Sequence, residues 1–121
     1  MTTPVSFSIA KLLKEKGFDV EDRKRYQMYG SQSIPQLERY SEVRWNLYKD
    51  YYLAPTIADV IMWLYEKHGI WISVQRDWDI GQCLGFEAII DDNSGIINTP
   101  TFNTPTEAYE AAIKFCLTKL V

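Results

Sequence analysis

Few side chains in this sequence have the types and spacing that chemistry requires. His68 is the only histidine, and the two cysteines, Cys83 and Cys116, are far apart in the chain. A structural zinc site needs four clustered ligands, so no usual zinc arrangement can be built from these residues. His68 is expected at the end of a helix, where an imidazolium interacts favourably with the helix dipole. The sequence therefore predicts no metal and no cofactor.

The acidic residues give weak catalytic signals. Asp77 and Glu87 could meet across a hairpin, as paired carboxylates do in glycoside hydrolysis. The run from Asp91 to Gly95 lacks the alternation and the final glutamate of a calcium loop, so we expect a turn. No Gly-rich phosphate loop follows a predicted strand. Without a nucleophile, base and orienting group, the chain is predicted not to be an enzyme.

The most informative feature is an aromatic stretch. Six of the eight tyrosines lie between Tyr26 and Tyr52, with Trp45 among them. Aromatic side chains outside regular periodicity are typical of interfaces, although plain core packing competes. Arg39 and Arg44 stand beside aromatics and could support stacking on single-stranded nucleic acid. The predicted interface is Trp45, Tyr48, Tyr51, Tyr52 and Trp63.

Length and composition indicate one domain spanning residues 1–121. The chain is 46% apolar and 14% aromatic, which is sufficient for a core without disulfides. Both cysteines are therefore expected to be buried and reduced. No apolar run approaches the length of a membrane span, and the N-terminus has no secretory pattern. We expect a cytoplasmic protein that does not contact a membrane.

Charge divides unevenly along the chain. Residues 1–52 carry nine basic and seven acidic side chains (+2), and residues 53–121 carry four basic and nine acidic ones (−5). Binding to phosphate backbones needs clustered lysine and arginine, but the basic run 23–25 directly follows two acidic residues. Nucleic acid is thus an unlikely partner and is kept as the alternative.

Periodicity predicts three helices. Ser6 or Ser8 begins the first, and Gly17 with Phe18 ends it. The second covers residues 57–68 and is apolar on nearly all sides, so we expect cover on more than one side. The third covers residues 105–120, with an N-cap threonine, a following proline and a glutamate at the third position.

Alternation predicts a sheet in the second half of the chain. Strands are expected over 70–77, 82–91 and 96–97, joined by turns at 78–81 and 91–95, with a bulge at Gly85. The fold class is therefore α+β, a small three-stranded antiparallel sheet packed with three helices. Residues 36–50 fit either a strand or a helix. The expected core is Leu13, Ile57, Val60, Ile61, Leu64, Ile72, Val74, Phe86, Ala88, Ala112 and Cys116.

Three blocks carry a family resemblance: the opening run from Ser8 to Phe18, Ala54-Pro55-Thr56 with the following helix up to Ile70, and the closing run from Thr104 to Leu120. Together they resemble small uncharacterised proteins of phage and prophage regions, mainly of Bacteroidetes. The resemblance carries no catalytic residue. It implies a bacterial accessory protein, and we expect a non-enzymatic module that binds a protein partner or a second copy of itself.

Overall fold

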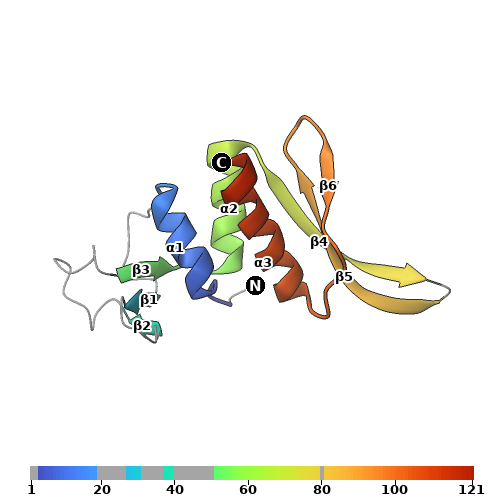
Figure 1. Cartoon of the computed structure of the whole chain (residues 1–121), viewed down its shortest axis with the longest axis horizontal. Coiled ribbons are helices and arrows are strands. Elements are labelled where there is room, and N and C mark those ends of the chain that lie inside the picture. The colour runs from blue at the N-terminus through green and yellow to red at the C-terminus, as the bar shows by residue number, and fades with distance from the viewer. Residues whose placement is uncertain (1–2, 19–26, 31–36, 40–50, 80) are drawn as a thin grey trace. The chain divides into compact units, whose positions relative to one another are not determined.

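The computed structural model describes residues 3–18, 27–30, 37–39, 51–79 and 81–121 (Figure 1). They belong to two compact units, Met1–Thr56 and Ile57–Val121, which we call unit 1 and unit 2. Helices and antiparallel sheets occur together, so the predicted α+β class is confirmed. The single domain expected for residues 1–121 stays a prediction.

Unit 1 begins with α1 (Phe7–Glu15), which buries Ile9, Ala10 and Leu13 on one face. Gly17 takes a positive φ of 83° after the helix. The backbone N–H of Phe18 then donates to the Leu13 carbonyl at 2.9 Å, and the Phe18 side chain is buried. This is the predicted stop signal, in which glycine allows the turn and an apolar residue folds back on the helix.

Three short strands form the sheet of unit 1. β1 (Gln27–Gly30) lies between β2 (Leu37–Arg39) and β3 (Tyr51–Ala54), and both pairings are antiparallel. This sheet was not predicted. Because residues 37–39 form a strand, the helical alternative for residues 36–50 is wrong at that point. Residues 40–50, which carry most of that alternative, lie outside the described residues.

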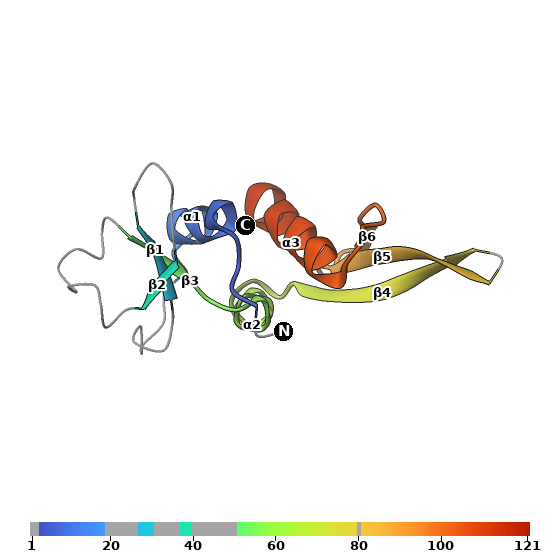
Figure 2. The ribbon, with the colours of Figure 1, turned by 90° about the horizontal axis from the view of Figure 1, so that it is seen from below.

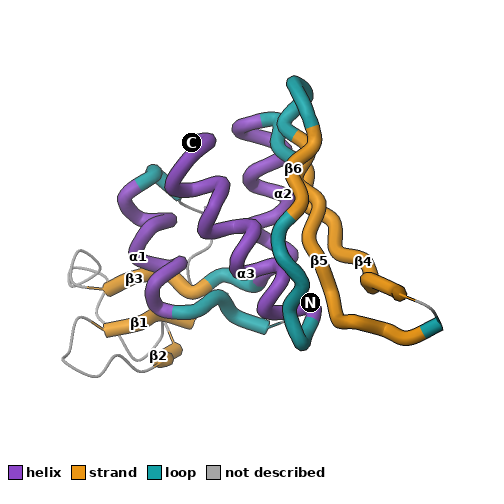
Figure 3. The backbone as a smooth tube through the Cα atoms, turned by 45° about the vertical axis from the view of Figure 1, so that its right-hand side comes forward, coloured by secondary structure: helices purple, strands orange, loops and turns teal. Residues whose placement is uncertain are grey.

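Unit 2 contains the predicted meander of β4 (Trp71–Asp79), β5 (Gln82–Asp91) and β6 (Ile96–Asn98), antiparallel throughout (Figure 3). The turn predicted for 78–81 is shorter, because β4 continues to Asp79, which pairs with Gln82. Asp77 pairs with Gly85 and Trp78 with Cys83, which leaves Leu84 unpaired on β5. The bulge is therefore confirmed beside Gly85.

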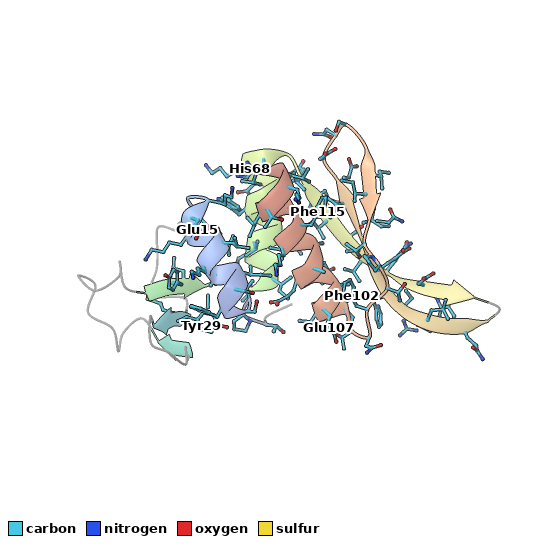
Figure 4. The ribbon with its side chains drawn as sticks, viewed as in Figure 1. Glu15, Tyr29, His68, Phe102, Glu107 and Phe115 are labelled. Carbon is cyan, nitrogen blue, oxygen red and sulfur yellow. The ribbon has the colours of Figure 1, made fainter. Side chains whose placement is uncertain are left out.

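Gly85 is needed for the backbone of this bulge. Its φ is 134°, a conformation that residues with a side chain rarely adopt. A Cβ at this position would collide with the carbonyl oxygen of Phe102 and lie 2.7 Å from the Thr101 side chain. Phe102 also exchanges backbone hydrogen bonds with Phe86, so residues 101–102 lie directly against β5 (Figure 4).

The helices of unit 2 are α2 (Ile57–His68) and α3 (Pro105–Phe115), and α3 continues into the π-helical turn η4 (Cys116–Leu120). The Thr104 hydroxyl accepts the backbone N–H of Glu107 at 3.1 Å, which confirms the predicted cap. α3 packs on β4 and β5, whereas α2 contacts β4 and α3. Figure 2 shows α3 along one side of the β4–β5 hairpin, which continues past the helix.

Most of the predicted core is buried. The confirmed positions are Leu13, Ile57, Val60, Ile61, Leu64, Ile72, Ala88, Ala112 and Cys116. The prediction is wrong for Val74 and Phe86, which are half-buried, and for Cys83, which is exposed. Cys83 and Phe86 lie toward the turn of the β4–β5 hairpin, whereas Val74 is opposite the buried Ala88. The hairpin itself extends beyond α3 (Figure 1). Alternation identifies the inner face of a strand, but it does not say how far the covering helix reaches.

Candidate functional site

The five residues of the predicted interface have different outcomes. Trp45 and Tyr48 lie outside the described residues, as does the side chain of Tyr51. Tyr52, in β3, is half-buried, and so is Trp63, in α2. The ring of Trp63 meets His68 edge to face, with centroids 4.9 Å apart. The interface as a whole therefore stays a prediction.

Tyr52 belongs to a group of aromatic side chains within unit 1, which we call the Phe7 cluster: Phe7, Tyr29 and Tyr52. The Phe7 ring lies edge to face against Tyr29 at 5.5 Å and against Tyr52 at 5.4 Å. The ammonium group of Lys14 lies 4.8 Å from the centre of the Tyr52 ring. The Tyr29 hydroxyl donates to the Val5 carbonyl at 2.7 Å. These aromatic side chains thus have partners inside their own unit.

Among the side chains whose exposure the structure describes, the exposed large apolar ones lie in unit 2. They are Met62, Tyr65, Trp71, Trp78, Leu84 and Ile96. The expected cover of α2 on more than one side is therefore wrong for Met62 and Tyr65. Large exposed apolar groups that lie together are typical of interaction sites, whereas single ones are ordinary. Whether these side chains mark an interaction site consequently depends on how they are grouped on the surface rather than on how many there are.

Tyr65 and Trp71 form an exposed pair. Tyr65 is 54% and Trp71 is 45% exposed, and their rings meet edge to face with centroids 5.6 Å apart. Trp71 is directly opposite Asp91 on β5, which is in turn opposite Ile96 on β6, a residue 68% exposed. Opposed residues of an antiparallel sheet point to the same face. An apolar group at each end of this row thus flanks one carboxylate.

This row belongs to the sheet face that points away from α3. Its residues alternate with the buried Ile72, Ala88 and Ile90, so they point to the opposite side. We call this the open face: Trp71, Ser73, Gln75, Asp77, Glu87, Ile89, Asp91, Ile96 and Asn98. None of these residues is a lysine or an arginine. The open face is therefore both apolar and acidic.

The three carboxylates of the open face accept hydrogen bonds from neutral groups. Asp77 accepts from the Thr101 hydroxyl at 2.9 Å, and Glu87 accepts from the Gln75 side-chain amide at 2.7 Å. Asp91 accepts from a backbone N–H at 3.0 Å. A neutral donor orients a carboxylate without cancelling its charge. The predicted carboxylate pair, Asp77 and Glu87, thus shares one face without being directly opposed, and each carboxylate has its own neutral donor.

The inner face of the hairpin beyond α3 forms a second exposed group. The guanidinium of Arg76 lies 6.0 Å from the Trp78 ring centre and 5.9 Å from that of Phe86. Trp78 is exposed here. Because Arg76 covers part of both rings, this end already has an internal polar partner for its aromatic surface.

The run from Asp91 to Gly95 is a turn, as predicted. The Asp92 carboxylate accepts from the backbone and hydroxyl of Ser94 at 2.9 and 2.8 Å, and from the Gly95 N–H at 3.1 Å. The side-chain hydrogen bond from Ser94 is the main reason that the pKa of Asp92 is below its usual value. Within the described ranges, no group of three His, Cys, Asp or Glu residues could hold a metal ion.

The two cysteines are free and differ in their surroundings. Cys116, the first residue of η4, is buried, and burial raises the pKa of its thiol to about 12. At neutral pH this thiol is protonated and unreactive. Cys83 is exposed on β5.

One signal in the sequence could have identified the exposed pair. Trp71 falls on the polar side of a strand that alternates with Ile70, Ile72 and Val74. An indole among serine and glutamine is out of place on a solvated face. Tyr65 was counted instead as part of the apolar surface of its helix.

Comparisons with known proteins add no relative. The chain matches no family model, and no curated protein is significantly similar to it. No solved structure matches its fold. In the part of the chain that the structure describes, no helix has the length and apolar character to cross a membrane.

Proposed function

We propose that the chain is a non-enzymatic protein-binding module of the phage or prophage type, acting in a bacterial cytoplasm through an aromatic surface. The observation that carries the proposal is the exposed Tyr65–Trp71 pair, in line with Ile96 across the open face. Aromatic residues of this kind anchor protein interfaces.

The energetics favour burial of this surface. Covering the exposed half of a large aromatic side chain removes roughly 100 Å² from water, which is worth about 2.5 kcal/mol. The pair and Ile96 together could supply the central anchor of an interface, while the carboxylates of the open face would form its polar rim.

Nucleic-acid association, the alternative, has less support in unit 2. Residues 57–121 carry four basic and nine acidic side chains, and this net charge of −5 repels phosphate. The alternative therefore concerns the more basic unit 1, where Arg39 and Arg44 stand beside aromatic residues in the sequence. A second copy of the chain is one candidate protein partner.

Selection from a random twelve-residue peptide display library tests the proposal. Wild-type protein should enrich peptides that lose binding to a Trp71→Ser variant. Trp78→Ser is the matched control, because it also removes an exposed indole from β4, at the other end of the strand and on the inner face. Circular dichroism should show both variants folded. If no peptide is enriched, or if Trp78→Ser abolishes binding and Trp71→Ser does not, the open face is not the binding surface.

A further inference from the structure

We propose that the partner of the open face is a basic polypeptide segment, with lysine or arginine side chains placed among apolar ones. This inference rests on the proposed function and adds the chemistry of the partner. The proposed function was argued from the exposed aromatic pair. This inference is argued from the charges and the strand register of the open face.

Acidic and basic side chains lie on opposite faces of this sheet. Asp77, Glu87 and Asp91 all point from the open face, which carries no basic residue. Arg76, the one basic residue in these three strands, points to the other face, toward Trp78 and Phe86. None of the basic residues of these three strands is therefore placed on this face to balance its charge.

The hydrogen bonds of these carboxylates leave them suited to a cationic partner. Thr101, Gln75 and the Asn93 backbone each supply a neutral donor to one carboxylate. A carboxylate has two oxygens and about four acceptor sites, so each retains acceptor capacity for an ammonium or guanidinium group. The existing bonds hold the carboxylates in place, which lowers the entropy lost on binding.

The register sets the spacing that such a segment must match. Trp71 and Asp77 are six residues apart on β4, which corresponds to roughly 20 Å along the strand. Asp91 lies between the apolar anchors Trp71 and Ile96, and Glu87 and Asp77 follow further along the hairpin. This order fits a segment with one basic residue among its apolar residues and further basic residues along its length. About six extended residues, or about thirteen helical ones, would span that length.

Charge complementarity favours this occupant over two others. A second copy of unit 2 would bring another net charge of −5 against the open face, and like charges oppose that approach. A nucleic acid would meet the same repulsion. Both remain outcomes of the test.

Fluorescence anisotropy with labelled twelve-residue peptides tests the inference directly. One probe repeats Lys-Val-Lys-Ser and the other repeats Glu-Val-Glu-Ser. The lysine probe should bind wild-type protein, more weakly as salt is raised from about 50 to 300 mM, and the glutamate probe should not bind. Asp77→Asn combined with Glu87→Gln should weaken the lysine probe about tenfold, since each charge pair contributes roughly 0.7 kcal/mol. Both replacements keep the oxygen that accepts the existing hydrogen bond.

The matched control is Glu15→Gln combined with Glu66→Gln, which removes the same charge from exposed helix positions elsewhere. It should change the affinity less than twofold. Equal losses in the two double variants would show that only net charge attracts the probe, and would overturn the inference.

The display selection separates this inference from the proposed function. Enriched peptides that depend on Trp71 and are basic support both. Enriched peptides that depend on Trp71 but are neutral or acidic overturn the inference and leave the function standing. Binding of a short DNA or of a second copy at the open face, seen by anisotropy or sedimentation, would also overturn it.

Discussion

The Phe7 cluster of unit 1 and the Tyr65–Trp71 pair of unit 2 have the same edge-to-face geometry, but the cluster is half-buried and the pair is more exposed. In the cluster, Phe7 meets two tyrosines, the Lys14 ammonium lies over the Tyr52 ring, and the Tyr29 hydroxyl donates to the Val5 carbonyl. In the pair, two rings touch each other and are otherwise exposed. Edge-to-face contact alone therefore does not distinguish a packing group from a binding group.

The difference lies in what surrounds the rings. The tyrosine-rich stretch suggested an interface, yet its described members Tyr29 and Tyr52 pack within their own unit. The exposed pair contains one tyrosine and one tryptophan from outside that stretch. Substitutions in the first group should change stability, and substitutions in the second should change binding.

The largest effect is expected from two neighbouring residues of α2. Leu64 is fully buried and Tyr65 is exposed. Leu64→Ala should lower the free energy of unfolding by roughly 2–5 kcal/mol, because it leaves a cavity. Tyr65→Ala should change it by about 0.5 kcal/mol or less. Urea unfolding measures both, and similar losses would contradict the assignment of Tyr65 to a free surface.

A smaller effect is expected in the Phe7 cluster. Phe7→Ala removes two edge-to-face contacts and part of a half-buried ring, so it should cost about 2 kcal/mol. Lys11→Ala, an exposed change on the same helix, should cost a few tenths. If the two variants unfold at the same urea concentration, the cluster does not stabilise unit 1.

The Asp92 turn should give a pH-dependent effect. The pKa of Asp92 is lowered in the folded chain from its ordinary value of 3.8, mainly by the side-chain hydrogen bond from Ser94, so its contribution to stability is present above about pH 3.8. That contribution is lost as the pH falls from 3.8 through the lower folded pKa. The stability difference between wild type and Asp92→Asn should therefore shrink between pH 6 and pH 3 in urea titrations. A constant difference would mean that the carboxylate charge has no role in the turn.

The two cysteines give the same contrast between a buried and an exposed side chain. It can be measured by chemical labelling and needs no stability measurement. Iodoacetamide should modify native protein once, at exposed Cys83, while Cys116 stays protonated and buried. Mass spectrometry should find one adduct on wild type, none on Cys83→Ser, and two on wild type in urea. Rapid native labelling of Cys116 would show that η4 opens readily.

Elements with local signals could be predicted from the sequence. The Thr104 cap, the apolar stripe of α2 and the alternation of β4 each lie within one short segment. The sheet of unit 1 could not be predicted, because its strands have three or four residues and β1 pairs with β3 across residues 31–50. Strands this short give too few alternations to detect. Which strand pairs with which across such a distance cannot be recognised from the residues of one short segment.

The candidate surface was predictable only in part. Alternation placed Trp71 on the outward side of its strand, but the exposure of Tyr65 depends on where α2 lies against β4 and α3. Similarly, Val74 and Phe86 are on the inner face, as expected, but they are only half-buried. The β4–β5 hairpin is longer than the part of it that α3 covers. The position of a helix on a sheet, and how far a strand extends past that helix, are properties of the tertiary structure that a local sequence pattern does not contain.

Gly85 has a consequence for how this protein can change over evolutionary time. Any side chain here would strain a φ of 134° and collide with the Phe102 carbonyl, while the adjacent Leu84 is unpaired and exposed. A scan of all substitutions should find that Gly85 tolerates almost no substitution, whereas Leu84, immediately before it, tolerates nearly every one. Gly85 has no side chain that could contact a partner. It should nevertheless be retained as the sequence changes, because the path of the chain into α3 depends on it.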